Sequence, residues 1–205
     1  MQNSEINSKM IMLATLAMLY GVLSICGQVM ASKTVVIFGI TASGGVFFMA
    51  STFPLNSVIT QRYGYKIMRS LILVTLVALV IVAALLSLLS NIQVNSSLTE
   101  AYREVFGITE LRIALASFMS YLLSENTTSF CTSLFKKTKL NLAVQIFFAA
   151  VMGILIDSII FTHLAFVGMF PYGIVLELVL SLIIIKTLVT LLVSIFFGIF
   201  IKKDI

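Results

Sequence analysis

The feature that most constrains this chain is a series of apolar runs, each long enough to cross a lipid bilayer. A crossing helix takes about 20 mainly apolar residues, because the hydrocarbon core is about 30 Å thick. Hydrophobic residues make up 60% of the 205 residues and charged residues 10%, against about 25% charged in soluble domains. The sequence therefore predicts an all-α integral membrane protein, a single domain over residues 1–205. We expect six spans, at about 10–31, 34–60, 68–92, 110–134, 141–166 and 174–201.

The second of these segments is irregular. Gly39, Gly44 and Gly45 loosen it, Pro54 removes a backbone hydrogen-bond donor, and Asn56 begins a polar stretch. We expect a discontinuous helix here. Transporters bind substrates at discontinuous helices near the membrane midplane. The alternative is a proline-kinked helix with a polar end.

Lysine and arginine residues divide unevenly between the two sides of the predicted bundle. Cytoplasmic loops carry the excess of these residues, so we expect both termini in the cytoplasm. The formal net charge of +5 fits this topology better than nucleic-acid binding, which we do not expect. Nine basic residues lie on the side of the termini, namely Lys9, Arg62, Lys66, Arg69, Lys136, Lys137, Lys139, Lys202 and Lys203, and three lie opposite, namely Lys33, Arg103 and Arg112.

Two charged residues stand inside apolar spans. Asp157 shares an i+4 helix face with Gly153, and Lys186 shares one with Thr190. A charge at the centre of a span costs about 2.5–3.5 kcal/mol on the insertion scale, so it usually faces a cavity or a partner. The two residues lie at similar depths, and we expect them to approach each other. They form either a structural ion pair or part of a substrate site.

The fourth span carries a wide polar face. Ser117, Tyr121, Glu125 and Thr128 follow at helical spacing, and Arg112 opens the segment. A helix this polar cannot face lipid all round. We expect it to line an aqueous path, with Arg112 as an interface anchor or a site residue. The alternative is a serine-rich helix that emerges early from the membrane.

Signatures of enzymes are missing from the sequence. There is no phosphate-binding G-x-x-x-x-G-K-[ST] loop, no His, Cys and acid cluster with metal-ligand spacing, and no nucleophile with a suitable base. We therefore expect no enzyme, no cofactor and no metal site. Cys26 and Cys131 lie within predicted spans, and a disulfide is not expected.

Several of these segments together resemble one family. They are NSVITQRYGYKIMRSLIL after the second span, RIALASFMSYLLSE in the fourth, MGILIDSIIF in the fifth and the apolar segment around Lys186. In order and spacing they resemble the queuosine precursor transporter family, also called the vitamin uptake transporter family, over roughly residues 31–200. The resemblance implies a six-span inner-membrane protein that imports 7-deazaguanines, namely the cyano or aminomethyl precursor of queuosine, or queuine.

The resemblance carries over to Arg112, Ser117, Asp157, Ser158 and Lys186. The roles follow from the chemistry of a guanine-like edge, whose N–H donors suit a carboxylate. Asp157 is the expected acceptor for the base edge, Glu125 a second acceptor or a proton carrier, and Lys186 and Arg112 would tune or neutralise these carboxylates. Ser57, Gln61 and Thr128 stand where the family has acids, and Glu125 stands where it has a glutamine, which leaves the substrate and the energy coupling open. The predicted substrate-binding set is Asn56, Arg112, Ser117, Tyr121, Glu125, Asp157, Ser158 and Lys186.

The sequence is consistent with three functions. The first is a secondary carrier or facilitator for 7-deazaguanines, with the substrate and the bilayer as partners. The second is a substrate-binding subunit of an energy-coupling-factor vitamin transporter, which needs an ATPase module. The third is a structural protein whose buried charges fix helix register. Oligomeric state is open.

Overall fold

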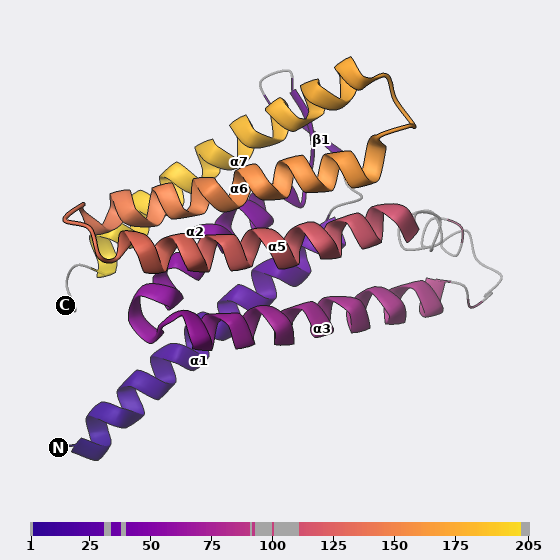
Figure 1. The fold of residues 1–205 in the computed structure, drawn as a ribbon. Coiled ribbons are helices and arrows are strands. Elements are labelled where there is room, and N and C mark those ends of the chain that lie inside the picture. The colour runs from indigo at the N-terminus through magenta and orange to yellow at the C-terminus, as the bar shows by residue number, and fades with distance from the viewer. Residues whose placement is uncertain are drawn as a thin grey trace.

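The computed structural model describes residues 2–30, 34–37, 40–90, 92, 100 and 111–201. Long helices form a bundle, and two short strands stand at one end of it (Figure 1). The predicted helical architecture is therefore confirmed in this part of the chain. The elements are α1 (Gln2–Val29), β1 (Thr34–Ile37), β2 (Ile40–Ser43), α2 (Val46–Tyr63), α3 (Tyr65–Ser90), α5 (Leu111–Phe135), α6 (Leu142–Phe166) and α7 (Tyr172–Ile201).

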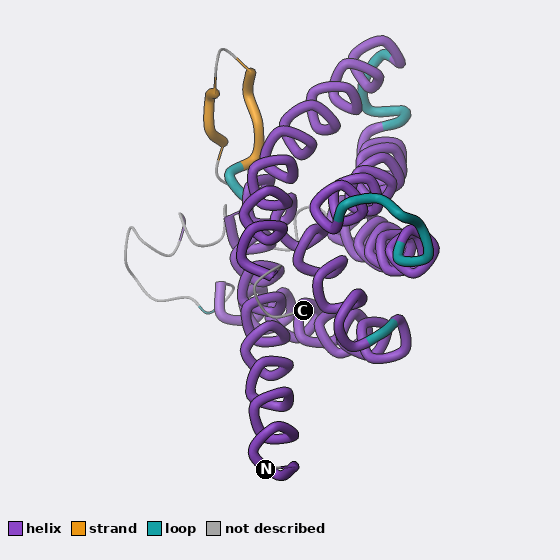
Figure 2. Tube along the Cα trace, turned by 90° about the vertical axis from the view of Figure 1, so that its left-hand side faces the viewer, coloured by secondary structure: helices purple, strands orange, loops and turns teal. Residues whose placement is uncertain are grey.

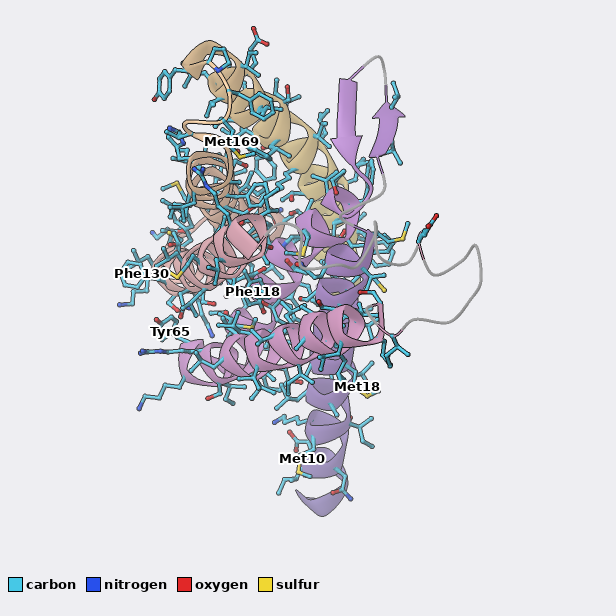
Figure 3. The ribbon with its side chains drawn as sticks, turned by 90° about the vertical axis from the view of Figure 1, so that its right-hand side faces the viewer. Met10, Met18, Tyr65, Phe118, Phe130 and Met169 are labelled. Atoms are coloured by element: carbon cyan, nitrogen blue, oxygen red, sulfur yellow. The ribbon has the colours of Figure 1, made fainter. Side chains whose placement is uncertain are left out.

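Four described helices are long and apolar enough to cross a membrane: α1, α3, α6 and α7. Their outer faces expose large apolar side chains; Met18 on α1 is 71% exposed and Leu88 on α3 is 65% exposed. Figure 3 shows Met10 and Met18 standing out from α1, away from the other helices. Apolar surface on this scale suits contact with acyl chains and not with water. The protein is thus a multi-pass membrane protein.

Helix α2 lies at the centre of the bundle. It packs against α1, α3, α5, α6 and α7, and every residue from 52 to 60 is buried. Because other helices and not lipid cover it, α2 can carry polar side chains and still lie at membrane depth. Helix α5 packs against α2, α3 and α6 and is polar for the same reason. That both cross the membrane, giving six spans, stays a prediction.

The predicted second span needs correction. Residues 34–37 and 40–43 are not helical; they form β1 and β2, which pair antiparallel, with Thr34 opposite Ser43. This hairpin stands apart from the helices (Figure 2). The strands contain β-branched Thr, Val and Ile, which favour extended backbone. The discontinuity predicted inside the helix is also wrong, since α2 runs unbroken from Val46 to Tyr63 with Pro54 inside it. Gly39 lies outside the described residues.

The continuity of α2 depends on a hydrogen bond from another helix. Pro54 has no N–H, so the carbonyl of Ala50, four residues earlier, loses its helical partner. The hydroxyl of Thr190 on α7 donates to that carbonyl at 2.9 Å. In a membrane interior, where water cannot satisfy a free carbonyl, this replacement keeps the helix intact.

Replacing Thr190 by valine should destabilise the protein by about 1–3 kcal/mol, because it leaves a buried carbonyl unpaired. Thermal unfolding in detergent measures the effect. The matched background is Pro54→Ala, in which residue 54 regains an N–H for the Ala50 carbonyl. The cost of Thr190→Val should be smaller there, and an equal cost in both backgrounds would contradict this account.

Most of the described basic residues lie at one end of the bundle. The first turns of α1, the α2–α3 turn at Gly64 and the connection between α5 and α6 lie at one end, with the last turns of α7; the hairpin and the α6–α7 connection lie at the other (Figure 1). Described basic residues at the first end are Lys9, Arg62, Lys66, Arg69, Lys136, Lys137 and Lys139. Lys33, Arg103, Lys202 and Lys203, and the predicted span limits at 31 and 110, lie outside the described residues.

Helices α5 and α6 pack closely at Gly153. A Cβ atom there would overlap Thr128 Oγ1 and would lie 3.0 Å from the backbone oxygen of Ser124. Backbone atoms cannot move aside cheaply, so a side chain at this position would push the two helices apart.

Gly153→Ala should therefore cost about 1–3 kcal/mol of stability, as overpacked cores do. Gly21→Ala on α1 is the matched control, since a Cβ there meets nothing within 4 Å and alanine favours the helix by about 0.5–1 kcal/mol. Melting temperatures in one detergent compare the two. Equal shifts for both variants would count against close α5–α6 packing.

Candidate functional site

A buried ion pair joins α6 to α7. Lys186 Nζ donates to Asp157 Oδ2, and each residue is 6% exposed. The predicted approach of these two side chains is therefore confirmed. The pairing matters energetically because a lone charge in this environment would be very costly. Thr190, one turn along α7, makes the bond to Ala50, so one face of α7 holds both α6 and α2.

A second acidic centre joins α2 to α5. Glu125 is 1% exposed; its Oε1 accepts from Thr52 Oγ1 at 2.6 Å, and its Oε2 accepts from Asn56 Nδ2 at 2.6 Å. Asn56 Oδ1 in turn accepts from Ser129 at 2.8 Å and from Thr60 at 3.2 Å. The donors from Thr52 and Asn56 are a hydroxyl and an amide, and both are neutral.

The two acidic centres differ in charge compensation. Asp157 has an ammonium partner, whereas Glu125 is held by a hydroxyl and an amide. Together they place polar groups from α2, α5, α6 and α7 in the bundle interior.

Tyr121 and Ser117 hold α5 against α1. The hydroxyls of Tyr121 and Tyr20 lie 2.8 Å apart, both buried, and Ser117 Oγ donates to Gln28 Oε1 at 3.3 Å. Thr52 and Tyr20 were not among the predicted site residues. Thr52 lies four residues before Asn56, on the same helix face, and that spacing could have found it; Tyr20 had no comparable signal.

Arg112 lies at the end of α6 and not at the acidic centres. Its Nε donates to the carbonyl of Leu164 at 2.7 Å and its Nη2 to that of Val167 at 2.6 Å. The last carbonyls of a helix lack helical donors and carry partial negative charge, which attracts a guanidinium. The structure thus does not bring Arg112 to the carboxylates that it was expected to tune.

Where the sequence departs from the family pattern, the side chains make hydrogen bonds to other neutral groups. Ser57 Oγ accepts from Thr132 at 2.9 Å, and Gln61 Nε2 donates to Gln145 Oε1 at 2.8 Å. Thr128 donates to the carbonyl of Ser124 at 3.0 Å. Hydroxyls and amides here take over the contacts between helices, so packing does not require an acid at these positions.

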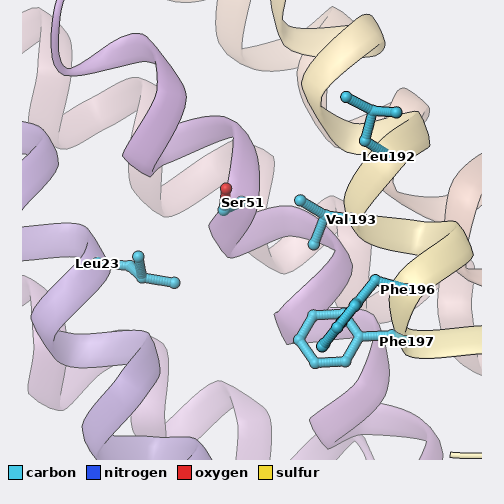
Figure 4. A pocket seen from close by; sticks show the side chains of 6 residues that line it. All are labelled: Leu23, Ser51, Leu192, Val193, Phe196 and Phe197. Atoms are coloured by element: carbon cyan, nitrogen blue, oxygen red, sulfur yellow. The ribbon is translucent and has the colours of Figure 1, made fainter. Parts of the chain in front are cut away.

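One hollow in the structure lies away from the predicted site residues. It has a volume of about 370 Å³ and lies among α1, α2 and α7 (Figure 4). Its lining is almost entirely apolar, and Leu192 in it is 71% exposed, which places it at the lipid-facing surface. The lining residues are Leu23, Ser51, Leu192, Val193, Phe196 and Phe197.

Ionisable residues enclosed between membrane helices are typical of the class of proteins that move polar molecules or ions across the bilayer. Comparison with known proteins narrows this class. Residues 43–200 match the model of a family described as "Putative vitamin uptake transporter". The chain therefore belongs to the vitamin uptake transporter family, a family of membrane transporters.

A similar protein comes from Bacillus subtilis (strain 168). It is named "Probable queuosine precursor transporter" and is 28% identical to this chain over 173 residues, which cover 81% of this chain and 74% of that protein. No solved structure matches the chain.

Proposed function

We propose that this protein imports 7-deazaguanine precursors of queuosine across the inner membrane, as a secondary carrier or facilitator. The cargo is the cyano or aminomethyl 7-deazaguanine, or queuine. The observation that carries the proposal is the pair of enclosed acidic centres, Glu125 and Asp157–Lys186, in a member of this family. The name of the Bacillus relative supports the cargo class.

The chemistry of the cargo suits buried carboxylates. A guanine-like edge presents N–H donors from N1 and from the exocyclic amine, and one carboxylate can accept both in a charge-assisted pair. An isostere without those donors would leave the carboxylate unpaired in a dry site, which gives selectivity. Asp157 acts as this acceptor, and Lys186 is its counter-ion while the site is empty. The ammonium shifts aside when the two N–H groups arrive.

Glu125 acts as the second acceptor or as the proton carrier. Asn56 and Thr52 orient its carboxyl group, and the Tyr121 and Ser117 contacts fix the helix that carries it. Ser158 follows Asp157 on α6. Arg112 has a positioning role at the end of that helix. The end of the bundle with the basic residues faces the cytoplasm, as the distribution of Lys and Arg favours.

Complementation tests this function. The gene should restore queuosine in the tRNA of a strain that can neither make nor import the precursors, when one of the three 7-deazaguanines is supplied. Uptake should persist in cells that lack every energy-coupling-factor ATPase. Dependence on such an ATPase would identify the protein as a substrate-binding subunit, and no uptake of any 7-deazaguanine would refute the proposed cargo.

A further inference from the structure

Two hydroxyl groups on α6, one and five residues after Asp157, are buried without hydrogen-bond partners. Ser158 and Thr162 on α6 are both 0% exposed, and neither Ser158 Oγ nor Thr162 Oγ1 makes a hydrogen bond. They are four residues apart, so they share one face of the helix, about 6 Å apart along its axis. Ser158 directly follows Asp157 in the chain.

Many other hydroxyls in the described helices are satisfied locally. A serine or threonine in an apolar helix usually donates to a carbonyl three or four residues earlier, which satisfies it locally. The hydroxyls of Ser158 and Thr162 make no such bond and so remain available to another molecule. Those that do donate to the carbonyl four residues earlier include Thr15, Ser24, Ser51, Ser70, Thr127, Thr128, Thr132 and Ser133.

We propose that Ser158 and Thr162 are specificity-determining residues that donate hydrogen bonds to acceptor atoms of the transported heterocycle. This inference rests on the proposed function. A carboxylate such as Asp157 only accepts, so it can bind the N–H donors of a guanine-like edge but not its carbonyl or ring nitrogens. Buried hydroxyls on the same helix supply the missing donors, and together the two kinds of group match a cargo that carries both donors and acceptors.

The position of these residues along the path is consistent with this role. Ser158 and Thr162 lie between Asp157 and the C-terminal end of α6 (Leu142–Phe166), which Figure 1 places at the same end of the bundle as the hairpin. If the basic end faces the cytoplasm, cargo from outside meets Thr162 first, then Ser158 and then Asp157. The third unpartnered hydroxyl, Ser194, lies two turns along α7 from Lys186 and is not part of this set.

The variant pair Ser158→Ala and Thr162→Val tests the inference. The purified full chain in detergent is titrated with 7-cyano- and 7-aminomethyl-7-deazaguanine, and its melting temperature is measured without ligand. We expect the double variant to bind about tenfold more weakly, as loss of about 1.4 kcal/mol would produce. Its melting temperature without ligand should be unchanged or higher, because buried hydroxyls without partners destabilise an empty site.

The controls separate the possible failures. Thr127→Val and Ser133→Ala, which remove locally bonded hydroxyls, should leave affinity unchanged, and Thr162→Ser should retain the affinity that Thr162→Val loses. Unchanged affinity in the double variant, or a lower melting temperature together with weaker binding, would overturn the inference alone. Failure of the unaltered protein to bind either 7-deazaguanine would overturn the inference and the proposed function together.

Discussion

Replacing Lys186 by methionine will lower the free energy of unfolding by about 3–5 kcal/mol, the cost of removing one partner from a buried ion pair. The carboxylate of Asp157 is 6% exposed and has Lys186 as its ammonium partner. Without that partner the charge stays in a poorly solvated site. Thermal unfolding in detergent, or resistance to graded amounts of a denaturing detergent, reports the loss. Asp157→Asn should cost a similar amount, since it leaves the ammonium without a counter-charge.

The double variant Asp157→Asn, Lys186→Met separates the structural role of the pair from its role in transport. It removes both charges and keeps both side-chain volumes, so most of the lost stability should return. Uptake should not return with it, because the asparagine cannot accept both N–H groups of the cargo as a carboxylate does. A stable double variant with full uptake would show that the pair only holds α6 against α7. Strictly additive losses would show that the two residues do not interact.

The ion pair is also where prediction from sequence worked best. Depth along a helix follows from the rise per residue, and a buried charge needs a counter-charge. Those two facts were enough to place Asp157 against Lys186. The first follows from helix geometry and the second from electrostatics, so neither required knowledge of which helices are neighbours.

The partners of Glu125 lay beyond such reasoning. Thr52 and Asn56 precede Glu125 by 73 and 69 positions in the chain. Nothing in the local sequence pattern indicates that α2 packs on α5. The central position of α2 could not be predicted either. Its polar residues suggested an irregular helix, whereas they are covered by other helices. Arg112 was misplaced for a related reason: its partners are backbone carbonyls, which carry no sequence signal.

The hairpin at 34–43 shows how an apolar count can mislead. A run of valine, isoleucine and threonine is apolar enough to extend a predicted span, yet these β-branched residues favour strands. Helix α2 then begins at Val46 and has 18 residues, about 27 Å at helical rise. This is close to the hydrocarbon thickness of about 30 Å. The second segment predicted from composition was therefore too long, because it included the two strands of the hairpin.

Glu125→Gln should reduce uptake of the 7-deazaguanine precursors by about 10- to 150-fold, the loss expected for a charge-assisted hydrogen bond of about 1.5–3 kcal/mol. The substitution keeps the shape of the side chain. Its carbonyl can still accept from Asn56, and the Thr52 hydroxyl can rotate to accept from the new amide. Stability should therefore change much less than uptake. Labelled-precursor uptake, normalised to the amount of protein in the membrane, gives the first quantity, and the melting temperature gives the second.

Asn126→Ala is the matched control, because Asn126 is the next residue on α5 and its amide donates to the carbonyl of Leu122 on the same helix at 2.7 Å. It should leave uptake near that of the unaltered protein. Glu125→Ala should lose stability as well as uptake, since it leaves the buried donors of Thr52 and Asn56 without an acceptor. Normal uptake by the Glu125→Gln protein would mean that the α2–α5 cluster only joins two helices. In that case the cargo would depend on Asp157 alone, and the charge that drives or selects transport would have to be sought on α6.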